Sequence, residues 1–395
     1  MVDVPEGLLR ARHRDPYPYF EWLREHAPLL REDKPSGLTV WHVSRYADVR
    51  SLLSDTRLSK RPDLLPAYVA GPAGLNEHLV HADPPEHTRL RALVNTAFIP
   101  RRIAALEPLI HDTAAGLLAQ FADSGVADLI EDFAMPLTFT LICTILGVPA
   151  EGNTARTREV LAHTVNPVAS SAQRAAHERE LLDYLVALVA HKRRAGPVAE
   201  ADLLGALIAA SDEGGTLSES ELVGTAYLLL LVGHDTTVNL IGNGMLALLR
   251  HPHELQRLRD NPGLMPTAIE ELLRYDSPVR DATFRVCVKP IELAHGLISP
   301  GAIVSLLIGS ANHDWDQFDS PGRLDLSRSP NEHLAFGRGP HFCIGAALAR
   351  MEGAIAFRLL LDRFGDIGLA VPPQDLAWRP SRVMRGLYRL PVLVG

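Results

Sequence analysis

The pattern of apolar and polar positions divides the chain into helical and extended stretches. Apolar residues recur at helical spacing over residues 19–26 and 45–53, and residues 38–43 alternate as a strand does. Helical patterning then dominates residues 85–273, and a stretch rich in β-branched residues follows at 281–308. The pattern predicts one mainly α domain over residues 1–395, with small β-sheets at its side. Its β-containing part is expected near 38–60 and 281–308, and its helical body near 85–273 and 343–361.

One predicted helix is far longer than the others. Ser218 and Glu221 form a capping-box pattern, and nothing interrupts the helix before Pro252. Residues 219–250 would extend about 48 Å at 1.5 Å per residue, enough to cross the molecule. A central helix is normally apolar on all sides, yet the middle of this one holds Gly233, His234, Asp235, Thr236 and Thr237. These residues indicate either a packing notch or a kink that presents an acid and an alcohol to a buried site.

Composition and charge exclude several classes of protein. The chain has 395 residues, of which 47% are hydrophobic and 22% charged, so it can fill a large core. Its 39 basic and 47 acidic residues give a net charge of -8, which argues against nucleic acid as a partner. The apolar runs at 133–148 and 227–233 are shorter than about 18 residues, and residues 1–14 lack an apolar signal core. We therefore expect a cytoplasmic protein without a membrane segment.

The three cysteines are too few and too widely spaced for a disulfide framework or a four-cysteine zinc site. Cys143 lies in an apolar helical run and Cys287 in a predicted strand, so both are expected in the core. Cys343 lies in a glycine-rich loop just before a helix. Helix-end N–H groups stabilise a thiolate, and a thiolate ligates a metal or attacks an electrophile.

The loop around Cys343 resembles a known motif. From Phe336 to Gly345 it reads Phe-Gly-Arg-Gly-Pro-His-Phe-Cys-Ile-Gly, which is similar to the haem-binding loop of the cytochrome P450 family. The resemblance implies the P450 fold, with its long central helix crossing over a buried haem b. It also implies that Cys343 is the axial ligand of the haem iron.

A second motif supports the resemblance. Glu271 and Arg274 match the family's Glu-x-x-Arg, whose spacing places both side chains on one helix face. In the family this pair meets an arginine of a downstream Pro-x-Arg segment, which is Arg323 here, followed by Leu324 in place of the usual phenylalanine. The resemblance assigns this trio a structural role.

Haem carries two propionates, which need cationic or hydrogen-bonding partners when buried. Four basic residues stand at matching positions of the family and are implied to bind the propionates: His87, Arg91, Arg285 and His341. Each alone is more typical of a solvated surface.

The middle of the long helix resembles the family's oxygen-binding motif. The resemblance implies that Asp235 relays protons from solvent during the activation of dioxygen and that Thr236 holds the protonated intermediate. Val232 stands where the family prefers alanine or glycine, so we expect a narrower cavity beside the oxygen site.

The family's substrate contacts fall in five segments of this chain, at residues 64–80, 164–173, 227–236, 278–283 and 383–384. Val232, Val279, Arg280 and Met384 are the expected lining. Arg280 and Asp281 add charge, either to contact a polar substrate group or to pair with side chains at the surface. The surface interpretation is favoured because ionic residues are seldom buried without a partner.

The resemblance implies a monooxygenase that inserts one atom of O2 into a hydrophobic secondary metabolite, such as a polyketide, macrolide, terpenoid or cyclic peptide. Ferredoxin and ferredoxin reductase, as separate proteins, would supply the electrons. Candidates for a basic docking face are Arg101, Arg102, Arg338 and Arg350. Two alternatives remain, an oxidative coupling or ring-closing enzyme with the same haem chemistry and a non-catalytic haem protein. Asp235 and Thr236 argue against the latter, because a sensor needs no proton relay.

Overall fold

The structure is a computed structural model that describes residues 4–35, 37–65, 75–96, 98–149, 171–195, 202–214 and 217–395. Its contacts divide the chain into two compact units. Unit 1 comprises Met1–Ser59, His111–Met135 and Thr236–Gly395, and unit 2 comprises Lys60–Ile110 and Pro136–Asp235. Cys343 and the Glu-x-x-Arg motif therefore belong to unit 1.

Unit 1 contains a five-stranded mixed sheet with the strand order β1-β2-β8-β5-β3. Only the β2–β8 pair is parallel. The strands are β1 (Leu29–Asp33), β2 (Thr39–Val43), β8 (Ile303–Leu306), β5 (Arg285–Cys287) and β3 (Leu58–Ser59). Val43 and Val304 of this sheet pack in one core with Val49 and Leu52 of α3 (Tyr46–Leu52).

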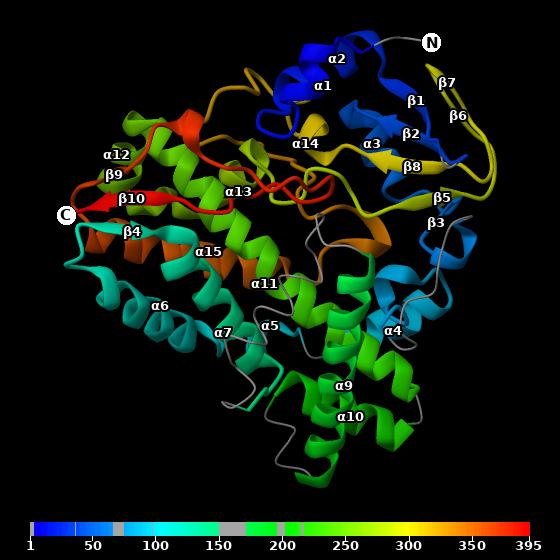
Figure 1. The fold of residues 1–395 in the computed structure, drawn as a ribbon, viewed down its shortest axis with the longest axis horizontal. Helices are drawn as coiled ribbons and strands as arrows, with labels where there is room; N and C mark the ends of the chain where they lie inside the picture. The colour runs from blue at the N-terminus through cyan, green and yellow to red at the C-terminus, as the bar shows by residue number, and fades with distance from the viewer. Residues whose placement is uncertain are drawn as a thin grey trace. The chain divides into compact units, whose positions relative to one another are not determined.

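A second sheet of three strands, β4-β10-β9, lies at the other end of unit 1 (Figure 1). Its strands are β4 (Val126–Asp128), β10 (Pro391–Val394) and β9 (Ile367–Leu369), and a separate hairpin pairs β6 (Ile291–Leu293) with β7 (Gly296–Ile298). The helices of unit 1 are α1 (Glu6–Ala11), α2 (Tyr17–His26), α3, α12 (Pro252–Asp260), α13 (Met265–Tyr275), α14 (Ile308–Ala311) and α15 (Ala346–Arg363).

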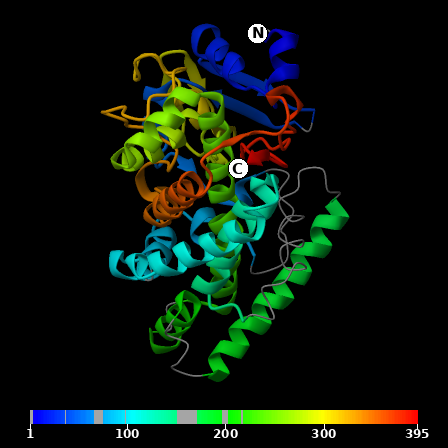
Figure 2. The same cartoon turned by 90° about the vertical axis from the view of Figure 1, so that its left-hand side faces the viewer.

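Unit 2 is helical in its described residues. Its helices are α4 (Glu86–Asn95), α5 (Pro100–Ala104), α9 (Ser171–Ala195), α10 (Leu203–Gly214) and, apart from its first residue, α7 (Met135–Ile145). A π-helical turn over Leu129–Ala134 leads into α7. α6 (Glu107–Phe121) begins in unit 2 and ends in unit 1. Figure 2 shows α9 as the long helix of unit 2, and a 2.6 Å ion pair joins its Lys192 to Asp202, just before α10.

The long helix predicted from the sequence is α11 (Glu219–Arg250), and its 32 residues are helical without interruption. The capping box forms as expected: Ser218 Oγ accepts from the Glu221 N–H at 3.1 Å, and the Ser218 N–H donates to Glu221 Oε2 at 2.9 Å. A β-carbon at Gly233 would lie 2.7 Å from Ile142 Cδ1. Gly233 is therefore a packing notch, which is one of the two interpretations of this stretch.

Two further glycines allow α11 and α15 to approach closely in unit 1. A β-carbon at Gly244 would lie 2.5 Å from Phe357 Cζ, and one at Gly353 would lie 3.0 Å from Leu240 Cδ2. Since real β-carbons essentially never come within 3.0 Å of such atoms, Gly244 fixes the spacing of the two helices. The helix that follows the cysteine loop is thereby held against the long helix.

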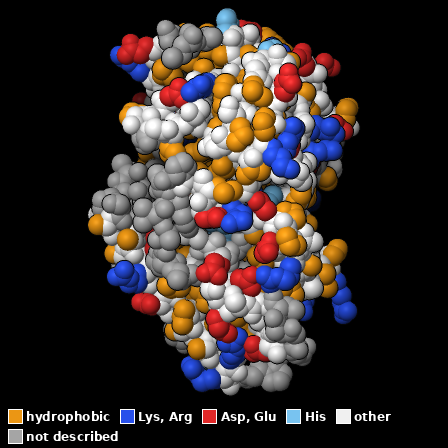
Figure 3. Space-filling view, turned by 90° about the vertical axis from the view of Figure 1, so that its right-hand side faces the viewer, with side chains coloured by type: hydrophobic (Ala, Val, Ile, Leu, Met, Phe, Trp, Pro, Cys, Tyr) orange, Lys and Arg blue, Asp and Glu red, His pale blue; other side chains and the backbone are white. Residues whose placement is uncertain are grey.

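Within the described ranges, no helix has the length and apolarity that a bilayer span requires. On the face shown in Figure 3, acidic and basic side chains are interspersed.

Candidate active site

The loop that carries Cys343 is shaped by glycines and precedes α15. Gly337 and Gly339 have φ values of 68° and 71°, in the left-handed region that favours glycine. A β-carbon at Gly339 would also lie 2.4 Å from Ser54 Oγ. The Cys343 N–H donates to the Phe336 carbonyl at 2.9 Å, which closes the loop. The Cys343 side chain is thus presented by a fixed turn just before a helix N-terminus.

Cys343 differs from the other two cysteines in its exposure. Cys143 and Cys287 are buried in the core, as the sequence predicts, whereas Cys343 is half-buried and not part of a disulfide. A β-carbon at Gly345 would lie 4.0 Å from its sulfur, so Gly345 leaves the space beside the thiol open. Next to it, the Arg350 guanidinium covers the Phe336 ring at 4.4 Å. Cys343 is thus the one cysteine of the three that is not enclosed in the core.

Arg285 of β5 is a buried cation in the same unit. Its side chain donates to the Thr283 carbonyl at 3.0 Å, and no carboxylate of the described residues lies within ion-pair distance of it. Burial lowers the pKa of Arg285 to about 10, although the negative charge of Asp281 opposes that shift. A buried guanidinium without a counter-ion fits an anionic ligand, such as a haem propionate.

The other predicted propionate partners are divided between the units. His87 and Arg91 lie one turn apart on α4 in unit 2, whereas His341 lies in unit 1, in a 3₁₀ turn (Gly339–His341) beside Cys343. His87 is buried, and this burial, followed by the charge of Arg91, lowers its pKa. His87 is therefore a neutral imidazole at neutral pH and can donate a hydrogen bond without adding charge.

The polar stretch of α11 has an exposed apolar residue beside it. Asp235 is buried and Thr236 half-buried, while Val232 is 44% exposed on a largely buried helix. Val232 thus offers exposed apolar surface one turn before Thr236. His234 has a structural role, because its Nδ1 lies 3.0 Å from the Leu230 carbonyl oxygen and its ring packs edge-on against Phe139.

Glu352 of α15 escaped the sequence prediction. It is 2% exposed and hydrogen-bonded to Thr237 of α11, while its Oε2 has no partner in the described structure. Burial raises the pKa of Glu352 to about 8, so it is mostly protonated at neutral pH. The signal in the sequence was a lone acid between Leu348 and Ala356 on an apolar helix face.

Glu271 and Arg274 form the predicted ion pair, fully buried, with two bonds of 2.8 and 2.9 Å. The prediction that Arg323 is the third member of this network is wrong, because its side chain is exposed. Arg323 contacts the pair through its main chain, since its carbonyl accepts from Arg274 at 3.3 Å. Arg328 instead reaches Glu271 Oε2 at 3.0 Å. The Pro-x-Arg spacing selects Arg323, the first arginine of the segment. The arginine whose side chain reaches Glu271 is the second, Arg328.

Two residues of the expected substrate lining meet in the structure. Val279 and Met384 are opposite each other in an isolated antiparallel β-bridge, and the Arg280 N–H donates to the Val383 carbonyl. Val232 belongs to unit 2. Residues 66–74 and 150–170, which hold much of two expected substrate segments, lie outside the described residues.

The prediction that Arg280 and Asp281 pair with other side chains at the surface is wrong, because both residues are buried. Arg280 donates to three main-chain carbonyls, those of Arg12, Ser381 and Arg382, at 3.1, 2.7 and 3.0 Å. Asp281 accepts from Ser305 Oγ at 2.7 Å. Main-chain carbonyls satisfy the hydrogen-bond donors of a buried guanidinium without neutralising its charge. The sequence does not reveal such partners, because every residue carries a carbonyl.

The basic docking face is only partly supported. Arg338 is exposed, but Arg350 is ion-paired with Glu270 at 2.6 Å, so it offers no uncompensated charge. Arg101 and Arg102 belong to unit 2.

Comparison with known proteins gives a consistent result. The family model for cytochrome P450 matches residues 7–262 and 263–370. The chain is 43% identical to the cytochrome P450 monooxygenase PikC of Streptomyces venezuelae over 96% of this chain and 91% of PikC. It is 38% identical to the polyketide biosynthesis cytochrome P450 PksS of Bacillus subtilis over 96% of both chains. The crystal structure of the myxobacterial cytochrome P450 CYP267B1 with myristic acid is similar at a TM-score of 0.93 and 36% identity, covering all of both chains.

Proposed function

The chain belongs to the cytochrome P450 family, and we propose that it inserts one oxygen atom from O2 into a hydrophobic secondary metabolite. The observation that carries this proposal is Cys343, half-buried in its glycine-shaped loop before α15, in the same unit as a buried Arg285 without a counter-ion. A thiol and an uncompensated cation are the donors that a haem requires of its protein. Bound haem supplies the oxidising chemistry that activates dioxygen.

Cys343 as the thiolate would hold the haem iron. Arg285 and His341 of unit 1 and His87 and Arg91 of unit 2 would bind the propionates. His87 contributes a neutral N–H, whereas Arg285 contributes a charge whose burial is compensated once a carboxylate binds.

Proton delivery falls to the polar middle of α11. One oxygen atom enters the substrate and the other leaves as water, which consumes two protons and two electrons. The half-buried Thr236 hydroxyl donates a proton into the site, and Asp235 replenishes it. Glu352, protonated behind Thr237, holds a further proton at its carboxyl group.

The substrate class follows from apolar lining and from the relatives. Val232, Val279 and Met384 offer aliphatic surface, which suits a polyketide, macrolide, terpenoid or cyclic peptide. A polyketide is favoured because the related PksS is described as a polyketide biosynthesis enzyme. Ferredoxin and ferredoxin reductase, as separate proteins, would supply the two electrons.

Replacing the Thr236 hydroxyl tests the proton role. Thr236→Ala should oxidise NAD(P)H at a rate similar to that of the native enzyme but release hydrogen peroxide in place of product. Thr236→Ser keeps the hydroxyl and should stay coupled. Equal coupling in the native and alanine enzymes would show that Thr236 does not donate the proton.

Isotope labelling tests the reaction type. Candidate substrates are found first by the spectral shift that they cause in the purified holoenzyme. Turnover under ¹⁸O2 should then place one labelled atom in each product molecule. A product without label would contradict oxygen insertion and would assign the enzyme to oxidative coupling or ring closure.

A further inference from the structure

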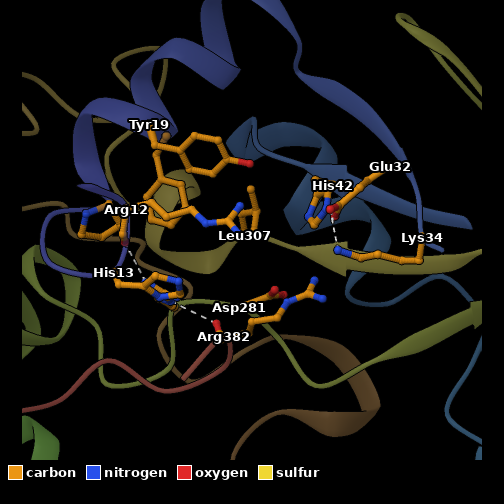
Figure 4. Close-up of a pocket in the computed structure, with 12 residues that line it drawn as sticks. Arg12, His13, Tyr19, Glu32, Lys34, His42, Asp281, Leu307 and Arg382 are labelled. Atoms are coloured by element: carbon orange, nitrogen blue, oxygen red, sulfur yellow. Dashed lines mark hydrogen bonds and ion pairs between the residues drawn. The ribbon is translucent and has the colours of Figure 1, made fainter. Parts of the chain in front are cut away.

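Unit 1 contains a small pocket, built from distant parts of the chain, that charged side chains share with Pro16, Tyr19, Phe20 and Leu307 (Figure 4). The α1–α2 connection provides Arg12 and His13, and strands β1 and β2 provide Glu32, Lys34 and His42. The loops after α13 and before β10 complete it with Arg280, Asp281 and Arg382. Its volume is about 70 Å³, far below the roughly 300 Å³ at which sites for drug-sized molecules begin. The pocket can take the head group of a ligand but not the body of a macrolide.

Of the residues predicted to line the substrate site, Arg280 lines this pocket, whereas Val232, Val279 and Met384 do not. Val279 and Met384 are paired across an antiparallel bridge, so their side chains share one face. The Arg280 guanidinium instead donates to the carbonyl oxygens of Arg12, Ser381 and Arg382.

The pocket has an excess of positive charge, although the whole protein carries -8. Arg12 and Arg382 have no carboxylate of the described residues within ion-pair distance. The guanidinium of Arg280 is hydrogen-bonded to carbonyl oxygens, which leaves its charge uncompensated. Three guanidinium groups thus converge on one small space.

The two carboxyl groups in the pocket are outnumbered by its four basic side chains, those of Arg12, Lys34, Arg280 and Arg382. Glu32 is already ion-paired with Lys34 and lies 2.9 Å from the His42 ring nitrogen, and these partners lower its pKa to about 2. Asp281 is buried, and this burial raises its pKa. In Figure 4, Glu32, Lys34 and His42 lie together on the right, and Asp281 and Arg382 lie lower in the view.

Two polar atoms beside the pocket lack hydrogen-bond partners. The Nδ1 of His13 and the Oδ1 of Asp281 are buried, and neither has a partner in the part of the chain that the structure describes. Buried polar atoms are nearly always hydrogen-bonded in folded proteins, to protein, water or ligand. His13 Nδ1 as an N–H can donate to an oxygen placed beside it.

We propose that this pocket binds a small oxyanion, either a carboxylate or a phosphate group. Arg12 and Arg382 provide the charge-assisted hydrogen bonds, Arg280 provides the fixed positive field, and His13 provides a further donor. An oxyanion of this size fits the volume, since one water takes up about 30 Å³ of liquid. The inference concerns a second site and does not depend on the proposed reaction.

The test is calorimetric titration of the purified holoenzyme with inorganic phosphate and, separately, with acetate. Chloride keeps the ionic strength constant, so that general screening does not change. We expect saturable binding of one anion per chain. Arg382→Gln and Arg12→Gln should each weaken it roughly tenfold, because each removes a charge-assisted bond. Arg14→Gln removes the same charge from an exposed neighbour outside the pocket and should leave binding unchanged.

The two anions separate the possible sources. Tighter binding of phosphate assigns the site to phosphate or a phosphorylated ligand, and tighter binding of acetate assigns it to a carboxylate head group. Arg382 is exposed, so its variant should fold normally, as the unchanged haem spectrum of the holoenzyme would verify. Absence of saturable binding for both anions would overturn the proposal. An equal loss in Arg14→Gln would do the same, because it would indicate a diffuse electrostatic effect.

Discussion

At the scale of single residues, the functional side chains that could be predicted are those whose neighbours in the sequence already mark them. Cys343 stands out because glycines surround it, and Thr236 because polar residues interrupt an apolar helix. Glu352 and Arg328 escaped prediction for a different reason. Their importance depends on what packs against them, Thr237 for one and Glu271 for the other, and these partners are far away in the sequence.

Glu352 gives a prediction about stability against pH. Its pKa is raised from 4.5 to about 8 in the folded state, so between these values the folded protein binds more protons than the unfolded one. The free energy of unfolding therefore falls as the pH rises through this window. Glu352→Gln keeps the shape without the ionisation, so its Tm should exceed that of the native protein at pH 8.5, and the difference should shrink toward pH 5.

Glu270→Gln is the matched control for this measurement. Burial raises the pKa of Glu270, but the bonds to Arg350 and His333 outweigh this and lower it to about 2. The contribution of Glu270 to stability is therefore present above the unfolded pKa and is lost in acid. This variant should therefore show no gain in Tm at pH 8.5. A Tm difference for Glu352→Gln that does not change with pH would contradict the buried, protonated carboxyl.

At the scale of elements, the helices with clear periodicity were predicted closely. α11 has its predicted bounds, and α2 and β2 each differ from the predicted range by a residue or two. Strand β1 was missed because its sequence Leu-Leu-Arg-Glu-Asp has no alternating pattern and its residues are only partly buried. It is a strand because its backbone pairs with β2, at the edge of the sheet.

The Glu271 network should be essential for stability. Glu271→Gln leaves the buried guanidinium of Arg274 and the nearby Arg328 without their carboxylate, which should cost about 3 kcal/mol or more of the free energy of unfolding. Asp362→Asn removes an exposed pair with Arg358 and should cost no more than about 1 kcal/mol. Chemical denaturation of both variants, together with their haem content, measures the difference. Equal costs would show that the buried network is not special.

The spacing of α11 and α15 can be tested with glycines. Gly244→Ala places a β-carbon against Phe357 and should destabilise the protein by about 1 to 3 kcal/mol. Gly116→Ala, on an exposed part of α6 with nothing within 4 Å, should stabilise it by about 0.5 kcal/mol. Thermal unfolding of the two variants gives the comparison. A neutral Gly244→Ala would show that the helices can move apart without cost.

At the scale of the whole molecule, the predicted P450 fold is confirmed by the similarity to solved P450 structures. The pocket in Figure 4 shows what sequence reasoning cannot reach. Its lining comes from residues 12–42, 280–307 and 382, and no local pattern relates these segments. Burial of Arg280 and Asp281 likewise depends on the complete fold, which is why the charge pattern alone gave the wrong environment for both.

The central claim is that the thiol of Cys343 ligates a haem iron, and one spectrum tests it most directly. The purified protein, reduced and exposed to carbon monoxide, should show the red-shifted Soret band of thiolate ligation. Cys343→Ser should lose that band, while Cys143→Ser, at a core cysteine, should retain it. A native spectrum of the globin type, or an unchanged band in Cys343→Ser, would contradict the account.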